Sequence, residues 1–215
     1  MILVTGGSGL LGSHLLFELV RKHGKLVATR RPSSDLEEVR RVFSCYSDRS
    51  DELFSLIEWV ETDLTNYVDV ECVMVGIDQV FHCAATVSFR PGDRLYMIRY
   101  NTESTANIVN ACLNLGVKRM LHVSSSSAIG AIADSEMPAD ETHIWNRTKS
   151  STGYAISKFR SEMEVWRGME EGLEAVIVNP TIILGPGYWD RGSSSIFSRV
   201  DGGLRFATPG TTGYV

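Results

Sequence analysis

The stretch VTGGSGLLG, Val4–Gly12, decides the fold. It follows an apolar start and runs into a segment whose leucines have helical spacing, so its glycines lie between a predicted strand and a predicted helix. Glycines there allow a tight turn and let backbone N–H groups approach a phosphate at the helix N-terminus. The spacing T-G-x-x-G-x-x-G departs by one residue from the common G-x-G-x-x-G, yet the context predicts dinucleotide binding. The residues predicted to bind the cofactor at this turn are Gly6, Gly9, Leu10, Leu11 and Gly12.

Outward from this turn, short β-rich runs alternate with longer helical patterns. The predicted strands cover residues 1–6, 25–30, 57–64, 77–85, 119–127 and 174–180. Helical patterns separate them, including one over residues 101–116. Such alternation is typical of βαβ units, in which helices cover both faces of a parallel sheet. The sequence therefore predicts an α/β fold, a Rossmann-type doubly wound parallel sheet, over residues 1–180.

Residues 181–215 differ in composition from the rest of the chain. They are rich in Gly, Ser and aromatic residues and contain no further βα repeat. We expect them to begin a smaller C-terminal substrate-binding region that is truncated here, with a natural short form as the alternative.

Composition narrows the function classes. The chain has 215 residues, of which 43% are hydrophobic and 22% charged, and a net charge of −5. The acidic balance and scattered basic residues argue against a nucleic-acid partner. No stretch approaches the roughly 20 apolar residues of a membrane span, and no basic n-region of a signal peptide precedes the first strand. These features predict a cytoplasmic protein that acts on a small molecule.

The cysteines and histidines show no metal-ligand spacing. Cys45, Cys72, Cys83 and Cys112 form no C-x-x-C pair, and three of them lie in runs that look buried. This pattern favours reduced, packed thiols over a disulfide framework or a zinc site. We predict no metal.

The end of the second predicted strand bears on the choice of dinucleotide. An acidic residue at this place contacts the ribose hydroxyls of NAD, whereas an arginine accommodates the 2′-phosphate of NADP. The sequence offers Arg30 and Arg31 and no acid, which predicts NADP, with NAD as the alternative. Asp63 and Leu64 end the third predicted strand near an expected adenine, and a helix N-cap is the other interpretation of Asp63.

The stretch STGYAISKFR, residues 151–160, places Tyr154 and Lys158 one helical turn apart. Residues at i and i+4 leave a helix on the same face, so a phenol and an ammonium can serve one site. An adjacent ammonium, helped by the positive nicotinamide of an oxidised cofactor, lowers the pKa of a phenol, and we expect this effect on Tyr154.

In combination, these motifs resemble the extended short-chain dehydrogenase/reductase superfamily, the NAD-dependent epimerase/dehydratase group. The resemblance covers residues 1 to about 187 and is carried, in the order of that family, by TGGSGLLG at 5–12, DL at 63–64, HCAA at 82–85, Asn101, VSSSSAIG at 123–130, YAISK at 154–158 and NPTIILGPG at 179–187.

The resemblance implies roles for individual residues. Tyr154 would exchange a proton with the substrate oxygen, Lys158 would hold the nicotinamide ribose, and Ser125 would fix the substrate oxygen. Further residues expected near the cofactor are Ala84, Ala85, Asn101, Asn179 and Pro180. An N-cap is the other interpretation of Asn101.

The resemblance also narrows the reaction. Dehydratases of this group carry an Asp-Glu pair directly after the catalytic hydroxyl residue, where this chain has Ser126 and Ser127. The segment NPTIILGP is closer to dihydroflavonol and cinnamoyl-CoA reductases than to sugar-nucleotide epimerases. We predict a reductase of a small organic carbonyl compound, with epimerisation by transient oxidation and a non-catalytic dinucleotide sensor as alternatives. Family members often dimerise through a four-helix contact, so a homodimer is expected.

Three tryptophans receive predictions from their positions. Trp166 falls in the pattern of the apolar helix face, which predicts core packing. Trp145 and Trp189 flank the catalytic segment in loops, where a substrate-pocket wall and a structural role are both open.

Overall fold

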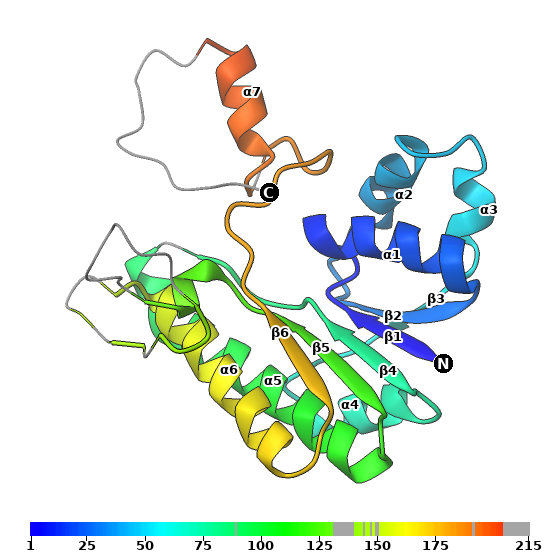
Figure 1. Ribbon diagram of the computed structural model, residues 1–215. Coiled ribbons are helices and arrows are strands. Elements are labelled where there is room, and N and C mark those ends of the chain that lie inside the picture. Colours follow the sequence, from blue (N-terminus) through cyan, green and yellow to red (C-terminus); the bar gives the residue numbers. More distant parts are fainter. Residues whose placement is uncertain are drawn as a thin grey trace.

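The computed structural model describes residues 1–88, 90–130, 140–143, 145–146, 148, 151–190 and 192–203 (Figure 1). Six strands form one parallel sheet in the order β3-β2-β1-β4-β5-β6. The strands are β1 (Ile2–Thr5), β2 (Leu26–Arg30), β3 (Ile57–Glu61), β4 (Gln79–His82), β5 (Arg119–Val123) and β6 (Ala175–Val178). This order is that of a doubly wound Rossmann fold, so the predicted fold class is confirmed.

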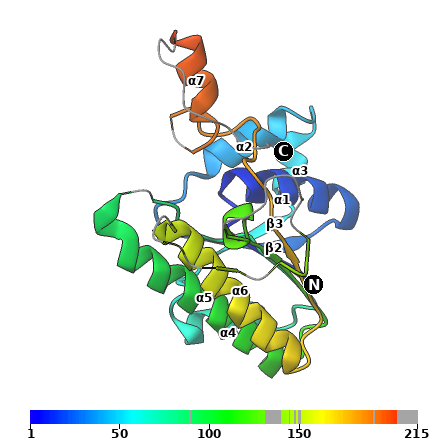
Figure 2. The ribbon, with the colours of Figure 1, turned by 60° about the vertical axis from the view of Figure 1, so that its left-hand side comes forward.

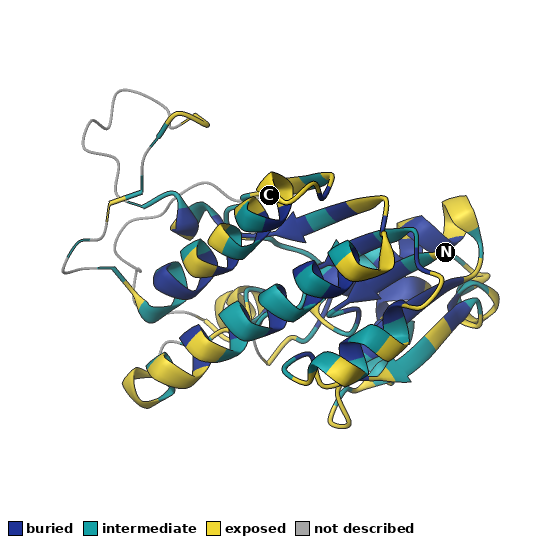
Figure 3. Cartoon of the chain, turned by 90° about the horizontal axis from the view of Figure 1, so that it is seen from below, coloured by how far each residue is buried: buried dark blue, intermediate teal, exposed yellow. Residues whose placement is uncertain are grey.

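Helices cover the sheet from both sides, as Figures 1 and 2 show. They are α1 (Leu10–His23), α2 (Leu36–Ser44), α3 (Ser50–Phe54), α4 (Tyr67–Met74), α5 (Arg94–Leu115), α6 (Gly153–Glu170) and α7 (Ser195–Asp201), with the 3-10 turns η1 (Pro91–Asp93) and η2 (Ser126–Ala128). The first three helices pack on one sheet face around Leu16 and Phe43, and α4 to α6 pack on the other around Met74 and Ile108. Figure 3 shows the buried strands between the two layers.

Local sequence signals explain several helix boundaries. The side chains of Asp35, Asn66 and Thr152 cap α2, α4 and α6 by accepting a backbone N–H of the first turn. Gly116 ends α5 in the left-handed conformation, at φ 67°. These boundaries are therefore set by the residues at the helix ends.

Several predicted boundaries are wrong. The fourth and fifth strands end at His82 and Val123, short of the predicted residues 85 and 127. The helix predicted to start at residue 101 begins at Arg94, because Pro91 opens a 3-10 turn that leads straight into α5. The third strand ends at Glu61, since the chain turns away from the sheet before Asp63.

The segment after β6 returns to the N-terminal half of the chain. His14 on α1 forms hydrogen bonds with the Pro186 carbonyl at 2.8 Å and, through its other ring nitrogen, with the Tyr46 hydroxyl at 2.7 Å. The Tyr188 hydroxyl donates to the Asp35 carbonyl at 3.1 Å. This segment thus lies against the start of α1, and α7 follows it (Figure 1).

The predicted division of the chain into two regions at residue 180 stays a prediction. Within the described residues, no helix is long and apolar enough to cross a membrane.

Candidate functional site

The glycine turn joins the end of β1 to α1. Gly6 has φ 70°, and a Cβ there would lie 2.6 Å from the Ala84 nitrogen. A Cβ on Gly12 would lie 2.1 Å from the Gly6 carbonyl oxygen, so neither position accepts a side chain. Gly9 is the N-cap of α1 and donates its N–H to the Gly6 carbonyl at 3.0 Å. Among the described residues no side chain caps this helix start, which leaves its N–H groups to an anion. The turn therefore fits a pyrophosphate.

The end of β2 carries the predicted phosphate-binding arginines. Arg30 lies 3.4 Å from the Glu61 carboxylate of β3 and is about one-third exposed. The Arg31 N–H donates to the Ser34 hydroxyl at 3.1 Å, and this hydroxyl lies 3.0 Å from that of Ser8 in the glycine turn. The two arginines thus stand beside the turn. β2 ends without an acidic residue, but Glu61 at the end of β3 places a carboxylate beside Arg30.

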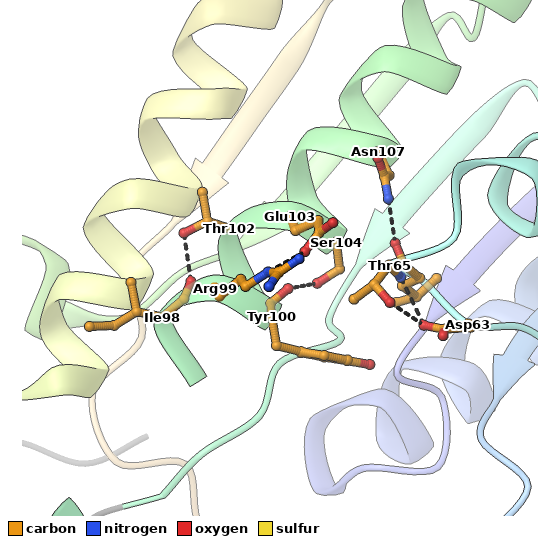
Figure 4. A network of polar contacts seen from close by, with 10 residues as sticks. Asp63, Thr65, Ile98, Arg99, Tyr100, Thr102, Glu103, Ser104 and Asn107 are labelled. Carbon is orange, nitrogen blue, oxygen red and sulfur yellow. Dashed lines mark hydrogen bonds and ion pairs between the residues drawn. The ribbon is translucent and has the colours of Figure 1, made fainter. Parts of the chain in front are cut away.

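Asp63 and Leu64 occupy the loop between β3 and α4. The Asp63 carboxylate accepts hydrogen bonds from the Thr65 N–H at 2.9 Å and the Thr65 hydroxyl at 2.8 Å. Asn66 caps α4, so the N-cap interpretation of Asp63 is wrong. Leu64 is buried, and its carbonyl accepts from Asn107 of α5 at 3.0 Å. Figure 4 shows the Tyr100 ring reaching from α5 toward this loop.

Asn101 fixes the loop that follows β4. Its side chain accepts the Thr86 N–H at 2.8 Å and donates to the Thr86 carbonyl at 2.9 Å and to the Ser157 hydroxyl at 3.1 Å. Asn101 lies inside α5 and is 2% exposed, so its N-cap interpretation is wrong. By holding Thr86, it sets the path of the preceding Ala84 and Ala85, both half-buried beside the glycine turn.

Tyr154, Ser125 and Lys158 meet where β5 and α6 approach each other. Ser125 follows β5, is 8% exposed, and shares a side-chain hydrogen bond with Tyr154 in the first turn of α6. Lys158 is 4% exposed and donates to the Val123 carbonyl at 2.8 Å. A phenol, a hydroxyl and an ammonium are thus brought together at the carboxyl edge of the sheet, where ligands of such folds bind.

The pKa values of this group are governed by burial. Burial raises the pKa of the Tyr154 phenol, and the Ser125 hydrogen bond opposes this effect without cancelling it. In the protein chain alone the expected lowering of the Tyr154 pKa is not observed, because removal from water outweighs the Ser125 hydrogen bond. Burial also lowers the pKa of Lys158 to about 8, while the charges of Cys83 and Glu162 favour its protonated form.

Asn179 connects β6 to this group. Its amide donates to the Ser125 carbonyl at 3.1 Å and to the Glu162 carboxylate at 2.6 Å. The Pro180 carbonyl accepts the Ser126 N–H at 2.9 Å. Sequence reasoning missed Glu162 as an electrostatic partner of Lys158. Its position one turn after Lys158, on the same helix face, was the available signal.

A pair of buried histidines lies beneath Lys158. His82 binds the Thr5 hydroxyl at 2.7 Å and the Thr105 hydroxyl at 3.1 Å, and its ring stacks on His122 with centroids 5.2 Å apart. Burial lowers the pKa of both rings, and the charge of Lys158 adds to this effect. Both rings are therefore neutral at neutral pH.

The tryptophans and cysteines only partly match the predictions. Trp166 is 55% exposed, so its predicted core position is wrong. Trp145 stacks on Phe159 of α6 with centroids 4.1 Å apart, and Trp189 is exposed. The thiols are free, but Cys45 and Cys72 are exposed, contrary to the expected burial of three. Across the described ranges, no cluster of three His, Cys, Asp or Glu residues could hold a metal ion.

Comparison with known proteins identifies a family and individual relatives. Residues 2–201 match the family model described as NAD dependent epimerase/dehydratase family. A putative dihydroflavonol 4-reductase of Synechocystis sp. is 34% identical over 188 residues, which cover 87% of this chain and 50% of that protein. Sterol demethylase protein B of Methylococcus capsulatus is 30% identical over 217 residues. The aligned region covers 99% of this chain and 61% of that protein.

Solved structures agree on the fold. The crystal structure of gox2253 has a TM-score of 0.74 at 30% identity, covering 94% of this chain and 57% of that one. UDP-glucuronic acid 4-epimerase from Bacillus cereus, in complex with NAD, has a TM-score of 0.74 at 21% identity, covering 93% and 62%. The chain spans between 50% and 61% of the length of the two curated relatives above.

Proposed function

Since the chain belongs to the NAD-dependent epimerase/dehydratase family, we propose that it is an enzyme that transfers hydride between a nicotinamide cofactor and the carbonyl or alcohol carbon of a small organic substrate. The observation that carries this proposal is the gathering of Tyr154, Ser125 and Lys158 at the same sheet edge as the glycine turn. A phenol and a hydroxyl this close can both donate to one substrate oxygen when that oxygen replaces the hydrogen bond between them.

Each residue has a role in carbonyl reduction. A reduced nicotinamide bound at this edge would supply the hydride to the carbonyl carbon. Ser125 donates a hydrogen bond that orients the carbonyl oxygen, and Tyr154 gives that oxygen its proton. The Tyr154 phenol is protonated at neutral pH, as a proton donor must be, since burial raises its pKa and does not lower it. Lys158 supplies a positive charge that stabilises the phenolate left after transfer.

For the cofactor we propose NADP, held at its 2′-phosphate by Arg30 with Arg31 beside it. The glycine turn would hold the pyrophosphate, and the loop with Asp63 and Leu64 would lie near the adenine. A fluorescence titration with NADPH and with NADH, repeated on Arg30→Ala, tests this assignment. We expect NADPH to bind more tightly than NADH and the substitution to remove most of that difference. Equal preference before and after the substitution would reject Arg30 as the determinant.

For the reaction we propose reduction of an aldehyde or ketone. Relatives named as reductases support this, as does the absence of an Asp-Glu pair after Ser125, where the chain has Ser126 and Ser127. The protein is mixed with NADPH and separate panels of aldehydes, ketones and UDP- or GDP-sugars. We expect net loss of NADPH absorbance with a carbonyl compound, slowed at least about 100-fold in Tyr154→Phe.

Three results of this assay would contradict the proposal. Sugar inversion without net cofactor change would identify an epimerase instead. Turnover unaffected by Tyr154→Phe would exclude the phenol as proton donor, and tight cofactor binding without turnover on any panel would favour a sensor.

A further inference from the structure

The parallel register of β2 and β3 brings an acid to the cofactor-selecting arginine. Arg30 is paired with Glu61, which is also the last residue of its strand. The Thr62 N–H donates to the Arg30 carbonyl at 3.1 Å and holds the two strand ends together. The guanidinium and the carboxylate lie 3.4 Å apart, at 31% and 52% exposure. The strand register therefore fixes the two side chains as neighbours at the sheet edge.

The charges around this edge are balanced. Arg30 and Arg31 supply two positive charges, and Glu61 and Asp63 supply two negative ones within the same two strand ends. Arg31 lowers and Asp63 raises the pKa of the Tyr100 phenol, so these two charges face the same ring. A 2′-phosphate carries a charge near −2 and is repelled by carboxylates, whereas a ribose 2′-hydroxyl can donate to one.

We propose that Glu61 is a specificity-determining residue that competes with the 2′-phosphate for Arg30 and thereby lets the site accept NAD as well as NADP. This inference rests on the proposed assignment of Arg30 to the 2′-phosphate. At 3.4 Å the ion pair is longer than a strong charge-assisted hydrogen bond, so a phosphate can displace Glu61 at the expense of that contact.

The test uses dissociation constants of NADPH and NADH for the whole chain, measured by fluorescence at low and at physiological salt. Glu61→Gln keeps the shape of the side chain and removes its charge. We expect NADPH to bind about 5-fold more tightly and NADH to change less than about 2-fold, with the gain smaller at higher salt. Unchanged relative affinities in Glu61→Gln would overturn the inference.

Glu58→Gln provides the matched control. Glu58 lies on the same strand and pairs with Lys25 at 3.5 Å, but it stands near the opposite end of β3. Its substitution should leave the affinities for NADPH and NADH unchanged. If Glu58→Gln has the same effect as Glu61→Gln, the change in affinity comes from the net charge of the protein, and the inference is overturned.

The double variant Arg30→Ala/Glu61→Gln separates this inference from the cofactor proposal. If Glu61 acts through Arg30, the gain in NADPH affinity disappears in the Arg30→Ala background. If the gain in NADPH affinity persists, Glu61 does not compete with the 2′-phosphate for Arg30. The proposal that the site binds NADP would still stand. A lack of effect of Arg30→Ala alone would instead reject the assignment of Arg30, and both ideas would fail together.

Discussion

At the scale of single residues, Lys158 combines a chemical role with an unfavourable position. Its ammonium is 4% exposed and has one hydrogen bond to a main-chain carbonyl, with the Glu162 charge in support. A buried charge without a close ion-pair partner destabilises the fold. A destabilising group of this kind is expected where the function of a site requires a charge that fold stability would disfavour.

Lys158→Met should therefore increase stability. The folded-state pKa of Lys158, about 8, lies below the unfolded value of about 10.4, so the unfolded state binds the proton more tightly. The resulting destabilisation of the wild type is full below pH 8 and disappears as the pH rises toward 10.4. We expect the variant to gain about 1–3 kcal/mol in urea unfolding at pH 7 and less at pH 9.5, after allowing for the lost hydrogen bond.

Lys25→Met is the control for this prediction, since Lys25 is largely exposed. It should change stability by less than about 0.5 kcal/mol at either pH. A Lys158→Met variant less stable than the wild type at pH 7 would show that the ammonium is not disfavoured by burial.

Gly12 offers a second prediction at this scale. A Cβ at Gly12 would overlap the Gly6 carbonyl, so Gly12→Ala must displace the turn. We expect at least about 10-fold weaker NADPH binding and a loss of about 2 kcal/mol in stability, measured by titration and urea unfolding. Gly92→Ala is the matched control, because a Cβ there meets nothing within 4 Å. Equal NADPH affinity in Gly12→Ala and wild type would exclude the turn as the binding site.

At the scale of elements, α5 and α6 pack together and leave apolar side chains on their outer surface. Figures 1 and 2 show the two helices side by side. Tyr96 on α5 and Met163 and Trp166 on α6 are more than half exposed. Met163 and Trp166 are three residues apart on α6 and so share one face of that helix, where exposed apolar residues close together mark an interaction surface. This exposure supports our proposal of a homodimer that uses both helices.

Trp166→Glu should then convert the dimer to a monomer. A buried carboxylate in an apolar helix contact is strongly unfavourable, so we expect the mass measured by light scattering to fall by half. Trp189→Glu, at a residue 52% exposed in the segment after β6, should leave the mass unchanged. A wild type that is monomeric at micromolar concentration would reject the proposal.

At the scale of the whole molecule, the two faces of the sheet are unequally covered. On the α1 side, β6 exposes Val176 at 59% and Val178 at 38%. The alternate residue Ile177 packs into the core with α5 and α6. A parallel sheet of this type is normally covered on both faces, and an apolar edge strand promotes association.

Val176→Lys should consequently reduce aggregation and the binding of a hydrophobic dye, without changing NADPH affinity. Val75→Lys, which alters a residue 71% exposed after α4, serves as the control and should have little effect on dye binding. Equal reduction by both variants would show that net charge, and not the exposed sheet face, governs association.

The α/β fold, the glycine turn and the Tyr154–Lys158 pair were predictable from the amino-acid sequence, because each depends on residues close together in the chain and on the periodicity of a strand or helix. The contact of Glu61 with Arg30, the link from Ser125 through Asn179 to Glu162, and the rise of the Tyr154 pKa on burial became visible in the folded chain alone. These features depend on strand register and on the exclusion of water, which join residues tens of positions apart and which no local spacing encodes.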